Sequence, residues 1–582
     1  MLKRLSKCVR ENRTPTILTL VFIMGEVFLE VLIPFITADL VNAVKAGAEL
    51  GEVVRSGLIL VAMAILSLTC GSVAGYTCAK ASAGFARNVR HDMFARIQTF
   101  AFENIDKFSS ASLVTRLTTD VNNVQFAFMM LIRTAIRSPM MFIFSIVMAY
   151  VMGGPLATTF VVVIPVLIAG LILIARKAMP AFRSVFRKYD RLNESIEENV
   201  RGMRVVKGFS REEYEKKKFG AAAEDIRKDF TRAERIVALN SPLMQLCIYF
   251  NMVFILLVGS RMIISSGGAT IDVGQISAMI TYGMQILMSL MMLSMIYVML
   301  TMSAESAKRI CEILNEESTL TNPEDPVMEV ADGSVDFENV SFKYSATAKR
   351  YALEGIDLHI DSGMTVGILG GTGSSKSTLI QLISRLYDVT EGCVKVGGVD
   401  VRRYDLDALR GAVSVVLQKN MLFSGTIREN LRWGDPDATD EEMEAVCRLA
   451  QADEFIRTFP EGYDTHIEQG GTNVSGGQGQ RLCIARALLG KPKILILDDS
   501  TSAVDTRTDA KIRAGLRTYL PETTKLIIAQ RVASVQDADR ILILDNGRIA
   551  ASGDHETLLK ESPIYREIYE QQTKGGAEDG QQ

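Results

Sequence analysis

The chain has 582 residues, of which 48% are hydrophobic and 23% charged, with a formal net charge of −3. This composition excludes disordered, collagen-like and disulfide-scaffold proteins, and the near-neutral charge implies no nucleic-acid partner. So apolar an average is unusual for a soluble protein and so many charges are unusual for a pure channel, which predicts a membrane protein with a large water-facing part.

Six apolar stretches are long enough to cross a hydrocarbon layer about 30 Å thick as helices. They are Thr16–Val41, Leu58–Ala79, Phe126–Met152, Leu156–Ala175, Leu243–Ile264 and Ile276–Leu300. The basic residues 1–13 precede them. A cleaved signal peptide is a poor explanation, because the first apolar run is long and further spans follow. Leu2, Leu5 and Val9 share one helical face, which favours an interfacial helix over a disordered tail.

Basic residues gather on one side of these spans. The segment Arg176–Lys218 is rich in lysine and arginine, whereas the loops on the opposite side are short. The positive-inside rule therefore predicts that this side and both chain ends face the cytoplasm, in a multi-pass protein of the cytoplasmic membrane. Apolar residues at helical spacing after the second and fourth spans predict long helical extensions beneath the membrane.

The composition changes after Ile313. We expect a transmembrane domain over residues 1–313, a linker over 314–332, a second domain over 333–572 and a polar tail over 573–582. In the second domain, apolar strands alternate with helices, which is typical of a parallel sheet buried on both faces. The predicted strands are Thr365–Leu369, Ser414–Leu417, Ile494–Leu497, Lys525–Ala529 and Arg540–Leu544.

A glycine-rich loop follows the strand Thr365–Leu369. It reads Gly370, Gly371, Thr372, Gly373, Ser374, Ser375, Lys376, Ser377 and Thr378, and an apolar helix comes next. Phosphate binding requires inward backbone N–H groups, a helix N-terminus and a nearby cation, and Mg²⁺ requires a hydroxyl. All four are present, so the loop predicts a nucleotide site.

Two further elements strengthen that prediction. The strand Ile494–Leu497 ends in Asp498, a carboxylate suited to Mg²⁺ held near phosphate. The segment Ser475, Gly476, Gly477 and Gln478 precedes another helix. Together with Lys376, these elements resemble the nucleotide-binding domain of ABC transporters. Six spans ahead of one such domain resemble an exporter-type half-transporter, and most of all one subunit of the bacterial heterodimeric multidrug exporters.

The resemblance implies a fold, cofactors and roles. The fold is a six-helix transmembrane domain with long cytoplasmic extensions, followed by an α/β P-loop ATP-binding domain, and the cofactors are ATP and Mg²⁺. Tyr344 matches the aromatic residue that stacks on adenine, and Asp505 matches an acid at the dimer interface. Gln418 matches a glutamine that contacts Mg²⁺ together with Ser377 and Asp498. Ser475–Gln478 and Asp505 would serve the ATP site of a partner chain.

Three residues depart from the family pattern. Asp499 stands where the family has the glutamate that acts as general base, and Gln530 stands where it has histidine. Ser375 replaces a glycine of the phosphate loop. A carboxylate withdrawn by about 1.5 Å and a side chain that cannot carry positive charge both predict slow hydrolysis. We therefore expect a degenerate ATP site in this chain, with hydrolysis mainly at the site of a non-identical partner.

Two clusters in the spans are candidates for a cargo cavity. Glu26 and Glu30 lie four residues apart on one face of the first span, and such acids either line a wet cavity or pair with basic residues inside the bundle. Met284, Met288, Met291 and Met295 recur at helical spacing in the last span. This pattern suits either ordinary packing or an adaptable surface for amphipathic cargo. The sequence leaves both choices open.

The expected function is ATP-driven export of hydrophobic or amphipathic small molecules by alternating access across a lipid bilayer. The alternative is an ATP-gated channel or a sensor without net transport, in which slow ATP sites also occur. Transport against a gradient would distinguish the pump from the channel.

Overall fold

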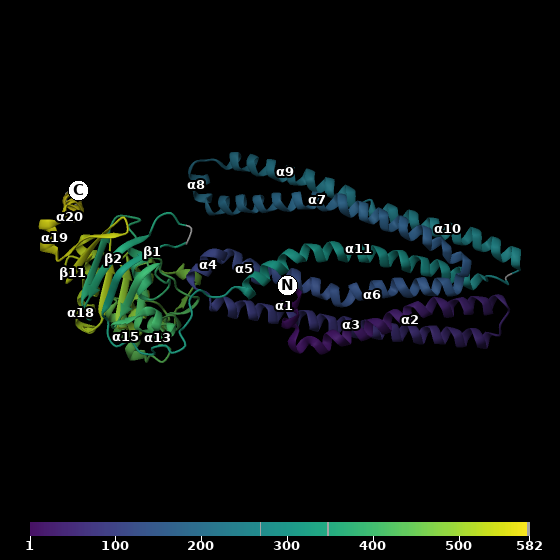
Figure 1. Ribbon diagram of the computed structural model, residues 1–582, viewed down its shortest axis with the longest axis horizontal. Coiled ribbons are helices and arrows are strands. Elements are labelled where there is room, and N and C mark those ends of the chain that lie inside the picture. The colour runs from purple at the N-terminus through teal and green to yellow at the C-terminus, as the bar shows by residue number, and fades with distance from the viewer. Residues whose placement is uncertain (268, 346–347, 579–582) are drawn as a thin grey trace. The chain divides into compact units, whose positions relative to one another are not determined.

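The computed structural model describes the chain except residues 268, 346–347 and 579–582. The chain forms two compact units (Figure 1). The first comprises Met1–Gln98 and Ser110–Glu316, and the second comprises Thr99–Ser109 and Glu317–Gln582. One short segment from the N-terminal half of the sequence therefore belongs to the second unit.

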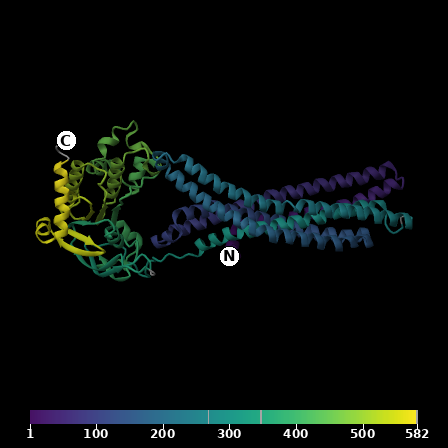
Figure 2. The same ribbon diagram turned by 90° about the horizontal axis from the view of Figure 1, so that it is seen from above.

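The first unit consists of helices. They are α1 (Leu2–Ser6), η1 (Lys7–Asn12), α2 (Arg13–Lys45), α3 (Leu50–Gln98), α5 (Ser110–Thr115), η2 (Arg116–Asp120), α6 (Val121–Gly153), η3 (Gly154–Thr158), α7 (Thr159–Arg201), α8 (Met203–Gly208), α9 (Glu212–Val237), α10 (Asn240–Ser266) and α11 (Val273–Asn315). Within this unit α2 packs along α3, α6 along α11 and α7 along α9 (Figures 1 and 2).

Among the described residues, five helical segments are long and apolar enough to cross a membrane. They are Lys3–Lys45, Leu50–Gln98, Ser110–Phe182, Glu212–Ser266 and Val273–Asn315. The sequence predicts six spans, and the difference lies in the third segment, which is 73 residues long. It contains α6 and the first part of α7, separated by the short helix η3, where Gly154 has a positive φ of 47°.

The N-terminal segment packs against the helices of the first unit and is helical, not extended. Leu5 and Cys8 are buried, and the Asn88 side chain donates a 3.0 Å hydrogen bond to the Cys8 carbonyl. Arg4 donates to the Leu314 carbonyl at 2.9 Å. These contacts tie the start of the chain to α3 and to the end of α11.

The second unit contains strands and short helices. The strands are β1 (Val335–Phe342), β2 (Leu353–Ile360), β3 (Thr365–Gly370), β4 (Glu391–Val396), β5 (Val399–Asp400), β6 (Val413–Val416), β7 (Gly425–Thr426), β8 (His466–Ile467), β9 (Ile494–Asp498), β10 (Thr524–Ile528), β11 (Arg540–Asp545) and β12 (Arg548–Gly553). In the described part of the chain, one sheet has six strands in the order β12-β11-β3-β10-β9-β6, and an antiparallel sheet has the order β2-β1-β4-β5.

The helices of this unit are α4 (Phe102–Phe108), α12 (Lys376–Ile383), η4 (Val401–Arg403), α13 (Leu406–Ala412), α14 (Ile427–Leu431), α15 (Asp440–Leu449), α16 (Asp453–Ile456), η5 (Gly462–Asp464), η6 (Gln469–Gly471), α17 (Gly476–Leu489), α18 (Thr506–Tyr519), η7 (Val532–Ser534), α19 (His555–Glu561) and α20 (Pro563–Glu578). Two apolar cores flank the large sheet: one holds Leu495 and Leu497 with α15 and α17, and the other holds Ile494 and Ile496 with α12.

The five strands predicted from apolar runs all occur, and they pair parallel to one another. Alternate residues of β9 enter opposite cores, so an uninterrupted apolar run is what a strand buried on both faces requires. The carboxyl ends of β3 and β9 lie at the same edge of the sheet, since both pair in parallel with β10. Ligands of open α/β sheets bind at this edge, and there the glycine-rich loop follows β3 while Asp498 ends β9.

Candidate nucleotide-binding site

The glycine-rich loop connects β3 directly to α12, as the sequence predicts. Gly370 has a φ of 156°, and a Cβ there would lie 2.2 Å from the Leu544 carbonyl oxygen, so only glycine fits. Gly373 has a φ of 83°. Gly371 and Thr372 are exposed at the tip, and Ser374 is buried beneath it. Helix α12 begins directly after the loop, and its first turn contains Lys376, Ser377 and Thr378.

Lys376 lies inside this loop. Its Nζ donates to the carbonyl oxygens of Gly370 and Gly371 at 2.8 Å each and contacts Ser374 Oγ at 3.3 Å. Burial lowers the pKa of Lys376, although the charges of Asp498 and Asp499 oppose the shift. A cation held against neutral carbonyls gains from an anionic ligand, because a phosphate replaces weak acceptors with strong ones.

Ser377 and Asp498 are brought together across the edge of the sheet. The Ser377 hydroxyl donates to Asp498 Oδ2 at 2.8 Å. Burial raises the pKa of Asp498, and the neighbouring Asp499 charge adds to the shift, while Ser377 and Lys376 oppose it. A hydroxyl oxygen and a buried carboxylate in contact form a donor set that Mg²⁺ accepts. When bound, the ion would neutralise charge on the phosphates between these two residues and Lys376.

Asp499, Gln418 and Gln530 form a second cluster beside the first. Oδ2 of Asp499 accepts from Gln530 Nε2 at 2.8 Å and from Gln418 Nε2 at 3.2 Å. The two predicted departures at Asp499 and Gln530 are thus directly bonded to each other. Asp499 has a φ of 48°, an uncommon conformation for a residue with a side chain.

Ser375 adopts the conformation that favours glycine. Its φ is 71° and its ψ is 26°, which is the left-handed region. It precedes α12 as the N-cap residue but makes no capping hydrogen bond through its side chain. A left-handed residue with a Cβ costs roughly 1–2 kcal/mol. The sequence marks Ser375 as unusual, and the structure shows that the unusual residue occupies a strained position.

Tyr344 lies on the other side of the loop helix. Its hydroxyl is 2.8 Å from Thr378 Oγ1 and donates to Gln381 at 3.3 Å. Its ring packs edge-on against Tyr387, with the centroids 5.3 Å apart. The residue is 46% exposed, as a residue that stacks on a planar base requires.

The segment Ser475–Gln478 forms the N-terminus of α17. Ser475 Oγ accepts from the Gln478 N–H at 3.3 Å, and Gln478 Oε1 accepts from the Ser475 N–H at 2.9 Å, a capping box. A Cβ on Gly477 would lie 2.8 Å from the Ala503 carbonyl oxygen, and Gly476 also lies beside Ala503. The segment therefore packs tightly on the loop that leads to α18.

Asp505 is the N-cap of α18. Its Oδ1 accepts from the Thr508 N–H at 2.9 Å, and the bonds from Thr508 lower the pKa of Asp505. Gln480 of α17 fixes the preceding loop, donating to Ser502 Oγ at 3.2 Å and accepting from the Ala503 N–H at 3.0 Å. The structure thus joins the two segments predicted to serve a partner's site, and the sequence gives no separate signal for Gln480.

Helix α4 contacts the antiparallel sheet side of this unit through Tyr387. The Tyr387 hydroxyl donates to Asp106 at 2.9 Å, and its ring lies 6.1 Å from that of Phe102. Tyr387 also packs on Tyr344. The sequence does not identify Tyr387, whose role depends on long-range contacts.

In the first unit, the acids of α2 are paired. Arg137 of α6 donates to both oxygens of Glu30, at 2.8 and 2.6 Å, and lies 3.5 Å from Glu26 Oε1. Of the two open interpretations of these acids, pairing inside the bundle is the one observed. The methionines of α11 are not buried within this chain. Met284, Met288, Met291 and Met295 are all at least 36% exposed, which differs from ordinary packing inside the bundle.

Comparison with known proteins identifies the family. Residues 16–290 match the family described as ABC transporter transmembrane region, and residues 353–502 match the family described as ABC transporter. An uncharacterized ABC transporter ATP-binding protein of Bacillus subtilis, YfiB, is 35% identical over 95% of this chain and 96% of its own length. One from Mycobacterium tuberculosis, Rv1273c, is 36% identical over 92% of both chains.

A solved structure of a bacterial Atm1-family ABC exporter with ATP bound has a TM-score of 0.82 at 24% identity, covering 97% of this chain and 98% of that one. This likeness establishes the shared fold. The chain therefore belongs to the ABC transporter family, and it joins a multi-pass membrane region to an ATP-binding, ATP-hydrolysing domain.

Proposed function

We propose that this chain is one subunit of a heterodimeric exporter whose own ATP site binds nucleotide but hydrolyses it slowly. The observation that carries the proposal is the contrast within one site. The groups that hold phosphate, Lys376, Ser377 and Asp498, have the expected contacts. The groups at the hydrolysis end are Asp499 bonded to Gln530, and the phosphate loop carries a strained Ser375.

The geometry supports slow chemistry in two ways. A general base must reach the proton that it abstracts, and Asp499 is one methylene shorter than glutamate. Oδ2 of Asp499 accepts from two glutamine side chains, which fix the position of this shorter carboxylate. Gln530 can donate a hydrogen bond to a γ-phosphate but cannot supply positive charge to it.

The roles of the remaining site residues follow in the proposal. Tyr344 stacks on adenine, residues 370–378 surround the phosphates, and Ser377, Gln418 and Asp498 hold Mg²⁺. The N-terminus of α17 and Asp505 face the ATP bound by a non-identical partner, whose own residues supply the general base. That partner carries glutamate and histidine at the positions of Asp499 and Gln530.

For the membrane region we propose six crossings, with α6 and α7 as separate spans joined at η3. Each is longer than the roughly 20 residues that a span requires. The basic segment of α7 to α9 supports the proposal that this side, both termini and the ATP-binding domain face the cytoplasm. The proposed domains are 1–313, 314–332 and 333–572, with a tail over 573–582, in the cytoplasmic membrane.

We propose hydrophobic or amphipathic small molecules as cargo. A groove of about 630 Å³ lies between α7 and α11, lined by Ile172, Leu290, Tyr297 and Arg176 among others. This volume lies in the range of small-molecule sites, and its walls combine aliphatic with polar groups. The exposed methionines on α11 add an adaptable apolar surface. Glu26 and Glu30 are held by Arg137, so their contribution to cargo binding is as part of an ion cluster.

The test uses the chain alone and together with its partner. Purified alone, the chain should bind ATP but hydrolyse it slowly, and the complex should hydrolyse it rapidly. Brisk hydrolysis by the lone chain would contradict the proposal. In sealed vesicles, uptake of cargo against a gradient that stops when turnover is blocked supports a pump, whereas passive flux under bound ATP supports the channel or sensor.

A further inference from the structure

The loop that carries Gln530 is fastened at both of its ends by other helices. It leaves β10 after Ile528, bears Gln530, forms η7 and continues through Asp537 towards β11. Arg531, the N-cap of η7, makes no capping hydrogen bond through its side chain. The backbone groups of this turn therefore need partners from elsewhere in the fold, because unpaired backbone groups are costly.

Gln572 of α20 supplies two of those partners. Its Oε1 accepts from the Val532 N–H at 2.8 Å, and its Nε2 donates to the Gln530 carbonyl at 2.8 Å. One side-chain amide thus bridges the residue before and the residue after Arg531. Both bonds have ordinary hydrogen-bond lengths, and the amide accepts in one and donates in the other. They fix the two peptide planes on either side of Arg531, and with them the direction of the Gln530 side chain.

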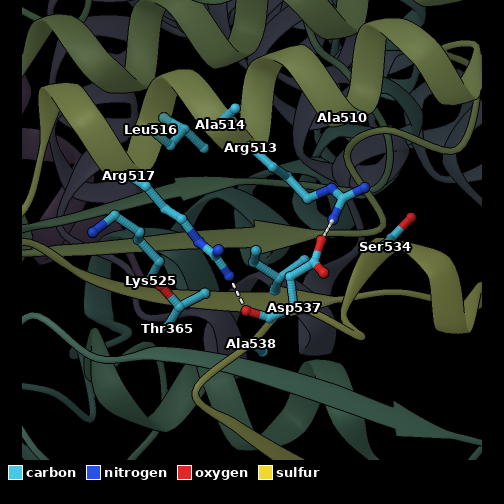
Figure 3. Close-up of a pocket in the computed structure, with 11 residues that line it drawn as sticks. Thr365, Ala510, Arg513, Ala514, Leu516, Arg517, Lys525, Ser534, Asp537 and Ala538 are labelled. Carbon is cyan, nitrogen blue, oxygen red and sulfur yellow. Dashed lines mark hydrogen bonds and ion pairs between the residues drawn. The ribbon is translucent and has the colours of Figure 1, made fainter. Parts of the chain in front are cut away.

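The far end of the loop is held by α18, as Figure 3 shows. Arg513 contacts Asp537 at 3.1 Å and Asp509 at 3.2 Å, and Arg517 donates to the Asp537 carbonyl oxygen. Ser534 Oγ donates to Asp509 at 3.1 Å. These contacts line a small cavity of about 110 Å³. With the far end fixed, the orientation of Gln530 depends on what holds the near end.

We propose that Gln572 is a positioning residue for ATP hydrolysis: through its two backbone bonds it holds Gln530 against Asp499, at the end of the site where the γ-phosphate is attacked. The C-terminal helix is thereby part of the hydrolytic machinery although it touches no nucleotide. The inference rests on the proposed site at Lys376 and Asp498, and it adds a dependence of that site on α20.

The chain of contacts is continuous. Gln572 bonds the backbone of Gln530, and the Gln530 side chain donates to Asp499 Oδ2 at 2.8 Å. Misplacing a reacting group by about 1 Å costs on the order of 100-fold in rate. In the proposed site, ATP affinity depends instead on Lys376 and Tyr344. The hydrogen bonds of these two side chains, among the described residues, go to the phosphate loop and α12 and not to α20. Loss of Gln572 should therefore lower the rate of the chemical step and leave ATP binding unchanged.

The experiment measures single-turnover hydrolysis of Mg·ATP by the purified full-length chain, with ATP varied to give both the maximal rate and the half-saturating concentration. We expect Gln572→Ala and the nearly isosteric Gln572→Met to lower the maximal rate by about five- to thirtyfold, the factor for one or two hydrogen bonds. The half-saturating concentration should stay constant. Gln571→Ala is the matched control and should have no effect, because among the described residues the Gln571 side chain donates to Glu567 of its own helix and not to the loop of Gln530.

A second arm tests that Gln572 acts through Gln530. In a Gln530→Ala background, Gln572→Ala should cause no further loss, because two residues in one chain of contacts are not additive. Equal rates for Gln572→Ala and Gln571→Ala, or a full additional loss in the Gln530→Ala background, would overturn the proposal. The absolute rate of the unmodified chain tests the slow site separately. If that rate is too low to compare, the same ratios are measured in an Asp499→Glu background.

Discussion

Two helices of the ATP-binding domain begin at segments assigned to phosphate, and they begin differently. Helix α17 starts at Ser475 in an extended conformation, with φ −69° and ψ 157°, and its capping box is complete. Helix α12 starts at Ser375 in a left-handed conformation without a side-chain cap. One N-terminus is satisfied by its own residues, and the other leaves backbone donors for a ligand at the cost of strain.

Under the proposed function, this contrast would let one domain serve two nucleotides unequally. A capped α17 keeps its shape without ligand and can be offered preformed to another chain. The α12 end gains most from a bound phosphate, because its donors and Lys376 have only weak acceptors otherwise. Altered residues cluster beside α12, at Ser375 and Asp499, and none lies in Ser475–Gln478.

The difference between the two helix N-termini is tested most directly by removing Lys376, the cation of the loop before α12. Lys376→Ala should weaken ATP binding by about 100-fold, since a charge-assisted contact to phosphate is lost from a partly buried site. Ser475→Ala in the same chain should bind ATP as the unmodified protein does. Titration calorimetry on both variants checks the pair. Equal affinities for Lys376→Ala and the unmodified chain would contradict the assignment of the site.

Restoring the hydrolysis end should have the next largest effect. Asp499→Glu combined with Gln530→His should raise ATP turnover of the purified chain by about 10- to 100-fold, because the carboxylate gains reach and the second side chain gains a titratable ring. Phosphate release at saturating ATP measures this change. Unchanged turnover would place the limitation at Ser375 or in the residues of the partner.

The α17 end is tested in the complex with the partner chain. Ser475→Ala should lower turnover of the complex by about tenfold, since the serine hydroxyl both caps the helix and is a donor towards the second nucleotide. Ser502→Ala is a nearby control that removes a hydroxyl bonded to Gln480 without altering the cap. If both variants turn over alike, α17 does not face the active nucleotide.

Relief of strain at Ser375 should give a smaller effect in stability. Ser375→Gly should raise the free energy of unfolding by about 1 kcal/mol, because glycine adopts φ 71° without a steric penalty. Ser475→Gly, at a helix N-cap with negative φ, should lower it by a few tenths of a kcal/mol. Melting midpoints of the two variants should therefore move in opposite directions. Shifts of the same sign would show that the α12 cap is not strained.

The smallest expected effect is a pH dependence from Asp498. Burial raises its pKa above the ordinary value of 3.8, so the folded nucleotide-free chain holds the proton more tightly than the unfolded chain does. Its contribution to stability is therefore full below that value and is lost as pH rises through the raised pKa. Asp498→Asn should melt roughly 2 °C higher at neutral pH and equally near pH 4. A constant difference across this range would exclude Asp498 as the cause.

Much of the ATP-binding domain could be predicted from the sequence because each parallel strand is marked by a few consecutive apolar residues. Runs such as Ile494–Leu497 have to be apolar on both faces, and the glycine-rich loop has to follow β3 at a fixed spacing. The family resemblance then implies roles for Tyr344, Gln418 and Asp505. The spans likewise follow from length and hydropathy, although α6 and α7 form one continuous segment in the structure.

The remaining features depend on conformation or on distant partners. The residue type does not determine the backbone angle φ. The left-handed conformations of Ser375 and Asp499 could therefore be found only in the structure. In the antiparallel sheet β2-β1-β4-β5, β1 mixes buried and exposed residues without regular alternation and its pairing has register shifts, which gives weak periodicity. Arg137 pairing with Glu30 joins residues 107 apart in sequence, and Gln572 lies 42 residues from Gln530. Such pairs follow from the packing of whole helices.

The contact between α4 and Tyr387 also has a consequence for biosynthesis. Asp106 and its hydrogen-bond partner Tyr387 are 281 residues apart in the chain. At roughly 5–20 residues per second, a ribosome needs about 15–60 s to synthesise the residues between them. During that interval Phe102 and its neighbours have no docking surface, so the first half of the nascent protein must wait, with an exposed aromatic tip, for the second half to emerge.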